Sequence, residues 1–92
     1  DPASDLAVLS AIVSSREDIS ISSKVCFAGE VGLSGEVRPV QKISSRIVEA
    51  QKLGFKKIYV SKYNDLSALS TINEITVFKV KKIEEVFRDL FS

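Results

Sequence analysis

The chain has 92 residues, 45% hydrophobic and 27% charged, a balance typical of one small globular domain rather than of a disordered or fibrous chain. It has no histidine and one cysteine, Cys26, which excludes an intramolecular disulfide, a multi-thiolate metal site and histidine-based catalysis. No apolar run approaches the roughly 20 residues of a membrane helix and no charged-then-apolar leader opens the chain, so we expect a cytoplasmic protein without a membrane partner.

The net charge of +1 is unevenly distributed along the chain. Residues 1–30 carry two basic and five acidic side chains, residues 31–64 seven and two, and residues 65–92 four and five. The middle third is therefore the one part of the sequence that offers an anionic partner a positive field.

Residues 1–18 have the pattern of a helix. Ser4 is a suitable N-cap, and Asp5 would interact favourably with the positive end of the helix dipole. Apolar side chains recur every three or four positions from Leu6 to Val13, which predicts a helix with a wide buried face.

Residues 24–40, KVCFAGEVGLSGEVRPV, have the pattern of a β-hairpin or a short run of strands. Gly32 and Gly35 provide the permissive backbone of its turn. Pro39 lacks an N–H and predicts a strand end or sheet edge at this point.

A second helix is predicted over residues 42–54, with Ile43, Ile47 and Ala50 facing inward and Gly54 ending it. Residues 56–60 and 74–80 are rich in β-branched and aromatic side chains and are predicted to be strands. The last segment predicts an amphipathic helix whose apolar positions are Ile83, Val86, Phe87, Leu90 and Phe91. The predicted fold is therefore α/β (α+β), in the order α-β-β-α-β-β-α.

The stretch GEVGLSGEVRPV, followed by a helix and then LGFKKIYVSKYN, resembles the Lon-protease-like domain at the C-terminus of RadA/Sms-type DNA recombination proteins. The opening DPASDLAV is similar to the helix-start motif of the same domain. These matches span almost the whole chain. Two glycine–glutamate pairs at fixed spacing on a hairpin are a specific signal, whereas the terminal helix would fit many folds.

The resemblance implies a fold like domain 2 of ribosomal protein S5. It also implies that residues 1–92 are a fragment of a Lon-like domain, without the strands that precede the DPA motif and without the upstream zinc and ATPase domains. ATP, Mg²⁺ and Zn²⁺ would then belong to those upstream domains, and this segment would have no cofactor of its own. The sequence contains neither a four-cysteine motif nor a phosphate loop.

True Lon proteases use a serine–lysine dyad, in which the lysine takes the serine proton. Matched onto this chain, the serine falls on Ala3 and the lysine on Ser44, so both chemical groups are absent. Ser4 and Lys42 lie one and two residues out of register and are poor substitutes. The resemblance therefore implies no catalytic residue and no enzymatic activity in this segment, although the full-length protein would be an ATP-dependent DNA translocase.

Three basic residues, Arg38, Lys42 and Arg46, are the predicted DNA contacts. As ordinary surface charges they would keep the domain soluble, but Arg38 lies inside the specific motif, where solubility does not explain it. Contacts would be made to the backbone of DNA, which we expect to be single-stranded. The tyrosines near these charges are Tyr59 and Tyr63, which gives little support for base stacking.

The resemblance implies a scaffold and DNA-contacting domain in a hexameric, ATP-driven recombination and repair motor that works beside a recombinase. Two other hypotheses remain open. The chain could be a serine peptidase related to Lon that uses an unconventional serine, or it could be a pure oligomerisation module whose apolar surfaces matter and whose basic residues do not.

Overall fold

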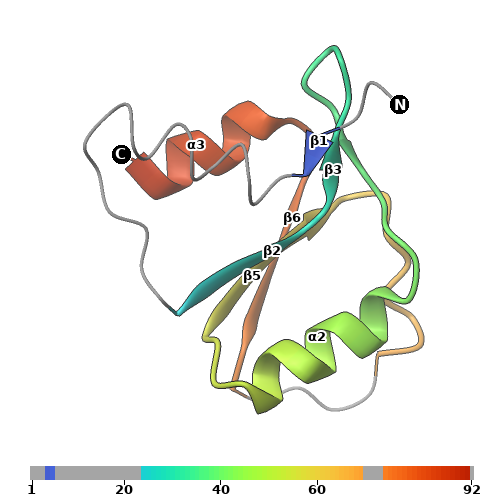
Figure 1. The fold of residues 1–92 in the computed structure, drawn as a ribbon, viewed down its shortest axis with the longest axis vertical. Helices are drawn as coiled ribbons and strands as arrows, with labels where there is room; N and C mark the ends of the chain where they lie inside the picture. The colour runs from blue at the N-terminus through green and yellow to red at the C-terminus, as the bar shows by residue number, and fades with distance from the viewer. Residues whose placement is uncertain (1–3, 6–23, 70–73, 92) are drawn as a thin grey trace.

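The computed structural model describes residues 4–5, 24–69 and 74–91, and these form two small sheets and two helices. Figure 1 shows their arrangement. The parallel sheet has the order β2-β5-β6 and contains Val25–Ala28, Lys57–Ser61 and Thr76–Val80. The antiparallel sheet has the order β1-β3-β4 and contains the two-residue strands Ser4–Asp5, Glu30–Val31 and Val37–Arg38. A mixed α/β fold with a parallel sheet agrees with the predicted class and with a Lon-like domain.

The predicted opening helix is wrong at its first residues. Ser4 and Asp5 form strand β1, which pairs antiparallel with Val31 and Glu30 of β3. The helix pattern reports local tendencies, whereas β1 depends on pairing with β3, which is distant in sequence. The rest of the predicted helix, residues 6–18, lies outside the described residues.

Helix α2, Ile43–Lys52, covers one face of the parallel sheet, as the periodicity predicts. Its three inward residues, Ile43, Ile47 and Ala50, are buried, and they pack with the sheet residues Ile58 and Val60. Gly54 follows the helix with a φ of 91°, the left-handed conformation expected of a glycine at this position.

Helix α3, Ile83–Phe91, packs on the other face of the sheet. Its buried Val86 belongs to a second apolar cluster with Tyr59 and Val80 of the sheet and Val31 and Val37 of the hairpin. Alternate residues of β5 therefore face opposite helices, as the pleat of a strand requires. The parallel sheet is the middle layer between α2 and α3.

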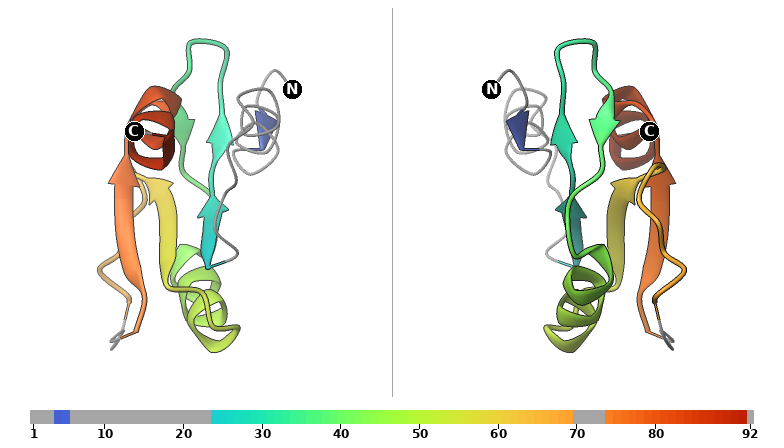
Figure 2. Two further views of the ribbon diagram at one scale, coloured as in Figure 1. Left: turned by 90° about the vertical axis from the view of Figure 1, so that its left-hand side faces the viewer. Right: turned by 90° about the vertical axis from the view of Figure 1, so that its right-hand side faces the viewer.

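The β3–β4 hairpin forms hydrogen bonds with the carboxyl ends of the parallel strands. It corresponds to the predicted run of strands around Gly32 and Gly35. The Ser61 hydroxyl donates to the Val37 carbonyl at 2.9 Å, and the Val37 amide donates to the Lys81 carbonyl at 2.8 Å. Figure 2 shows the turn of this hairpin protruding beyond the ends of β5 and β6. Pro39 follows the last residue of β4, at the strand end that was predicted.

Within the described parts of the chain, no helix is both long and apolar enough to cross a membrane. The same residues contain no group of three or more cysteine, aspartate or glutamate side chains placed to hold a metal ion.

Candidate nucleic-acid interface

The three predicted DNA-contacting residues lie on a short stretch that leads from β4 into α2. Arg38 ends β4, Lys42 precedes α2, and Arg46 lies one turn into the helix. The chain turns into the helix at Lys42, whose φ of 57° is uncommon for a residue other than glycine. The Arg46 amide then donates to the Lys42 carbonyl at 3.1 Å, and the Arg46 guanidinium donates from Nε to the Gln41 carbonyl at 3.2 Å.

Lys42 and Arg46 are exposed, and both line a groove of about 660 Å³ between α2 and the edge of the parallel sheet. Neither cation forms an ion pair with any other described residue. The groove floor is largely apolar, and its described lining outside these two cations is made by Cys26, Phe27, Ala28, Gln41, Ser45, Glu49, Ala50, Leu53, Phe55 and Ile58. The structure therefore brings two of the three predicted residues together beside an apolar groove.

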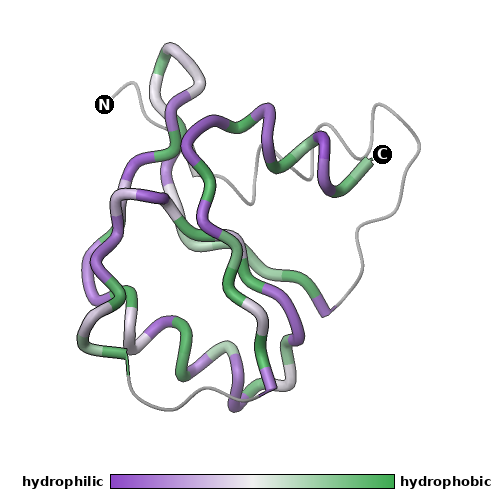
Figure 3. Tube along the Cα trace, turned by 180° about the vertical axis from the view of Figure 1, so that it is seen from behind, coloured by the Kyte–Doolittle hydropathy of each residue, from purple (hydrophilic) through white to green (hydrophobic). Residues whose placement is uncertain are grey.

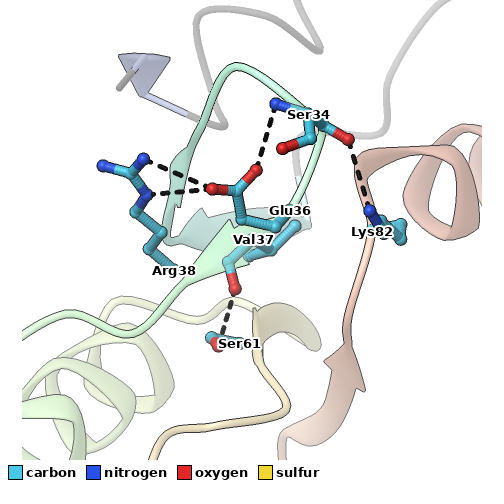
Figure 4. A network of polar contacts seen from close by, with 6 residues as sticks. All are labelled: Ser34, Glu36, Val37, Arg38, Ser61 and Lys82. Atoms are coloured by element: carbon cyan, nitrogen blue, oxygen red, sulfur yellow. Dashed lines mark hydrogen bonds and ion pairs between the residues drawn. The ribbon is translucent and has the colours of Figure 1, made fainter. Parts of the chain in front are cut away.

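Arg38 does not line this groove, and it forms an ion pair with an acidic neighbour. Its guanidinium lies 3.3 Å from the Glu36 carboxylate, with side-chain exposures of 39% and 35% (Figure 4). Arg38 is also the register partner of Glu30 on β3. The positive charge of Arg38 is thus partly compensated within the hairpin, and a DNA contact by this residue stays a prediction.

Glu36 holds this hairpin together through its carboxylate. The pKa of Glu36 is lowered, first by a hydrogen bond from its own backbone and then by one from Ser34, with a smaller contribution from Arg38. Gly32 lies against this carboxylate so closely that a Cβ atom would overlap it. The flexible Glu36 side chain can move away from such an atom, whereas Gly35, with a φ of 82°, is needed for its backbone conformation.

Of the two positions that correspond to the Lon dyad, the structure describes one. Ala3 lies outside the described residues. Ser44 is half-buried in the first turn of α2, where Ser45 is exposed. The buried hydroxyl of Ser61 donates to the backbone carbonyl of Val37 and is not part of such a dyad.

Cys26 lies on β2 and lines the same groove as Lys42 and Arg46. It is a free thiol that is half-buried, and burial raises its pKa. A raised thiol pKa lowers the thiolate fraction at neutral pH, which is typical of an unreactive cysteine.

Three further exposed lysines lie where the parallel strands end. They are not among the residues predicted from sequence to contact DNA. Lys62 follows β5, and Lys81 and Lys82 follow β6. In the sequence these three lysines look like ordinary surface charges. The signal that could have found them is their shared position just after a β-rich segment, since parallel strands end at one edge of a sheet.

Known proteins resemble this chain along its whole length. Residues 1–92 match the family described as Lon protease (S16) C-terminal proteolytic domain. DNA repair protein RadA of Streptococcus pneumoniae is 49% identical over 92 residues, covering 100% of this chain and 22% of that protein. DNA repair protein RadA of Bacillus subtilis is 42% identical over 88 residues, covering 96% of this chain and 19% of that protein.

The chain spans about a fifth of the length of these curated relatives. Their similarity covers 96–100% of this chain, and so includes both helices and the hairpin. The chain is therefore a member of the Lon protease C-terminal domain family, in the form found in DNA repair protein RadA.

Proposed function

We propose that this domain is a non-catalytic scaffold and DNA-contacting part of a RadA-type motor for DNA recombination and repair. The observation that carries the proposal is the pair Lys42 and Arg46, two exposed cations on one side of α2 with no acidic partner among the described residues. The name of the relatives, DNA repair protein RadA, supports DNA as the anionic partner.

In the proposed mechanism, Lys42 and Arg46 bind phosphates of the DNA backbone and Arg38 contributes when Glu36 releases it. Such contacts fix the position of DNA without reading its sequence. The domain would have the fold of ribosomal protein S5 domain 2 and would form a ring platform in a cytoplasmic hexamer. ATP, Mg²⁺ and Zn²⁺ would act in other domains, and a recombinase would be the partner in the cell.

The test is DNA binding by the intact protein carrying both Lys42→Ala and Arg46→Ala. Each phosphate contact adds about 0.7 to the salt slope of binding for a single strand and about 0.9 for a duplex. We expect the double variant to bind more weakly and to lose roughly 1.4 to 1.8 from that slope. Lys52→Ala with Lys56→Ala removes the same charge elsewhere on the surface and is the matched control. A slope no lower than in this control would refute the proposal.

A serine peptidase is the alternative that the family description favours, because it names a proteolytic domain. A fluorophosphonate probe labels activated serines and so tests this alternative directly. We expect no labelling of Ser4, Ser44 or Ser45, since no lysine occupies the dyad position. Labelling at any of the three would replace the scaffold proposal with a catalytic one.

A pure oligomerisation module would leave the cations without a role. Sedimentation of the intact protein at several salt concentrations, with and without single-stranded DNA, distinguishes this case. DNA that fails to co-sediment at low salt while the assembly remains intact would favour it over DNA contact.

A further inference from the structure

The carboxyl edge of the parallel sheet gathers cations from parts of the chain that are far apart in sequence. Because β2, β5 and β6 run parallel, the residues that follow them meet at one edge. Lys62 lies beside the end of β6, since its amide donates to the Val80 carbonyl at 2.8 Å. Lys81 and Lys82 come next, and the Lys82 ammonium donates to the Ser34 carbonyl of the hairpin at 3.3 Å (Figure 4).

Helix α2 begins at the same edge, which adds Lys42 to the group. The Asn64 side chain accepts from the Val40 amide at 3.3 Å and donates to the Val40 carbonyl at 2.8 Å, so the segment after β5 is fixed against the segment before α2. Lys42 and Asn64 line one hollow of about 400 Å³. Figure 3 shows mainly hydrophilic colours along the loops of this edge.

Carboxylates at this edge are mostly occupied by other partners. The Glu85 carboxylate accepts from the backbone amides of Lys81 and Lys82 at 2.7 and 2.6 Å. These bonds lower its pKa, and the charges of Arg88 and Lys62 lower it further. Asp65 accepts from the Ser67 amide at 2.9 Å, and Glu36 is paired with Arg38. The ammonium groups of Lys42, Lys62, Lys81 and Lys82 form no ion pair with another described residue.

An exposed aromatic residue follows the first of these lysines in the chain. Tyr63 comes directly after Lys62 and is 59% exposed. Tyr59, the other tyrosine of this region, is 1% exposed and stacks on Phe27, so it is unavailable to a ligand. A cationic track beside an exposed aromatic ring is the combination by which proteins bind single-stranded nucleic acid, with phosphates on the cations and a base on the ring.

We infer that the carboxyl edge of the parallel sheet binds single-stranded DNA, with Lys62, Lys81 and Lys82 contacting phosphates and Tyr63 stacking against a base. This inference rests on the proposed function, and it extends the DNA-contacting surface from α2 across the ends of β5 and β6. A duplex keeps its bases stacked on each other, so only a single strand gains from the ring of Tyr63.

The first experiment compares Tyr63→Ala and Tyr63→Phe in the intact protein, using a mixed-sequence single strand and the corresponding duplex. Loss of base stacking lowers affinity on the order of tenfold. We therefore expect Tyr63→Ala to weaken single-strand binding by that factor, Tyr63→Phe to retain it, and duplex binding to change little in both. Single-strand affinity that is unchanged in Tyr63→Ala, or an equal loss for the duplex, would overturn the stacking role.

The second experiment measures the salt slope of single-strand binding for Lys62→Ala with Lys81→Ala. We expect a loss of roughly 1.4, against no loss in Lys52→Ala with Lys56→Ala, which removes two exposed lysines at the opposite edge of the sheet. The same two pairs give a second readout without mutation, because bound DNA should protect Lys62 and Lys81, but not Lys52 and Lys56, from acetylation.

The two proposals fail in different ways. If Lys42→Ala with Arg46→Ala reduces the slope while the Lys62 and Lys81 pair behaves like the control, the inference about the sheet edge is wrong and the proposed function stands. If none of the variants differs from the control, the proposed function is wrong as well.

Discussion

Arg38 and Glu36 show how a neighbouring charge can decide whether a basic residue is available to DNA. Their ion pair is partly exposed, and pairs of this kind are weak. The proposed contact of Arg38 with a phosphate would require this pair to break. We therefore expect Glu36→Gln to raise DNA affinity about two- to fivefold in an equilibrium binding assay.

The matched control for this prediction is Glu36→Gln in an Arg38→Ala background. If the gain comes from releasing Arg38, it should disappear there, because the two substitutions act on one interaction. An equal gain in both backgrounds would mean that removal of a negative charge, rather than release of Arg38, strengthens binding.

The two glycines of the same hairpin show how far the role of a turn residue can be predicted from its residue type. The sequence predicts Gly32 and Gly35 as turn residues with a permissive backbone, and this is confirmed for Gly35 by its φ of 82°. Gly32 has no positive φ and instead lies against the carboxylate of Glu36. This contact involves a side chain four positions away, and no turn preference contains that information.

The contact between β5 and α3 depends on a polar group within an otherwise apolar cluster. The Tyr59 hydroxyl donates to the Asp89 carboxylate, and the Lys57 ammonium lies 3.4 Å from the same carboxylate and 4.7 Å from the centre of the Phe78 ring. Tyr59 is buried, while Asp89 is largely exposed. We expect Tyr59→Phe to lower the free energy of unfolding by about 1 kcal/mol, measured by denaturant titration.

The pH dependence of this loss follows from the two pKa shifts. The hydrogen bond from Tyr59 lowers the pKa of Asp89, so the stabilisation is present above the ordinary aspartate pKa of 3.8 and is lost as pH falls through the folded value. Burial, followed by Asp89, raises the pKa of Tyr59, so the stabilisation is also lost as pH rises above 10. The difference between wild type and Tyr59→Phe should be constant near neutral pH and shrink in strong acid and strong base. A difference that does not change with pH would contradict this account.

Elements with a strong internal period could be predicted from sequence, and elements that depend on a distant partner could not. The apolar spacing in α2 and α3 predicted the buried residues Ile47 and Val86 correctly. A helix makes its hydrogen bonds within itself, so its inward face follows from the local sequence. Strand β1 has two residues and exists through its pairing with Val31 and Glu30. The same limit applies to the candidate interface, since Lys62 and Lys81 meet through the parallel pairing of β5 with β6.

Strand β5 connects two apolar clusters on opposite faces of one sheet. Ile58 and Val60 pack with α2, and the intervening Tyr59 packs with α3. Ile47 lies in the α2 cluster and is fully buried, so Ile47→Ala removes a large part of a core side chain. Substitutions of this kind cost about 2–5 kcal/mol.

Because both clusters share β5, we expect the loss in Ile47→Ala to destabilise α3 as much as α2. Hydrogen exchange of the intact protein, followed by mass spectrometry, reports the two helices separately. Peptides from residues 43–52 and 83–91 should lose protection by equal free energies. Leu53→Ala is the control, since Leu53 is 68% exposed and its truncation should change protection by less than about 0.5 kcal/mol. Protection that falls in α2 alone would show that the two faces of the sheet unfold independently, and DNA bound along the sheet edge would then not stabilise both helices together.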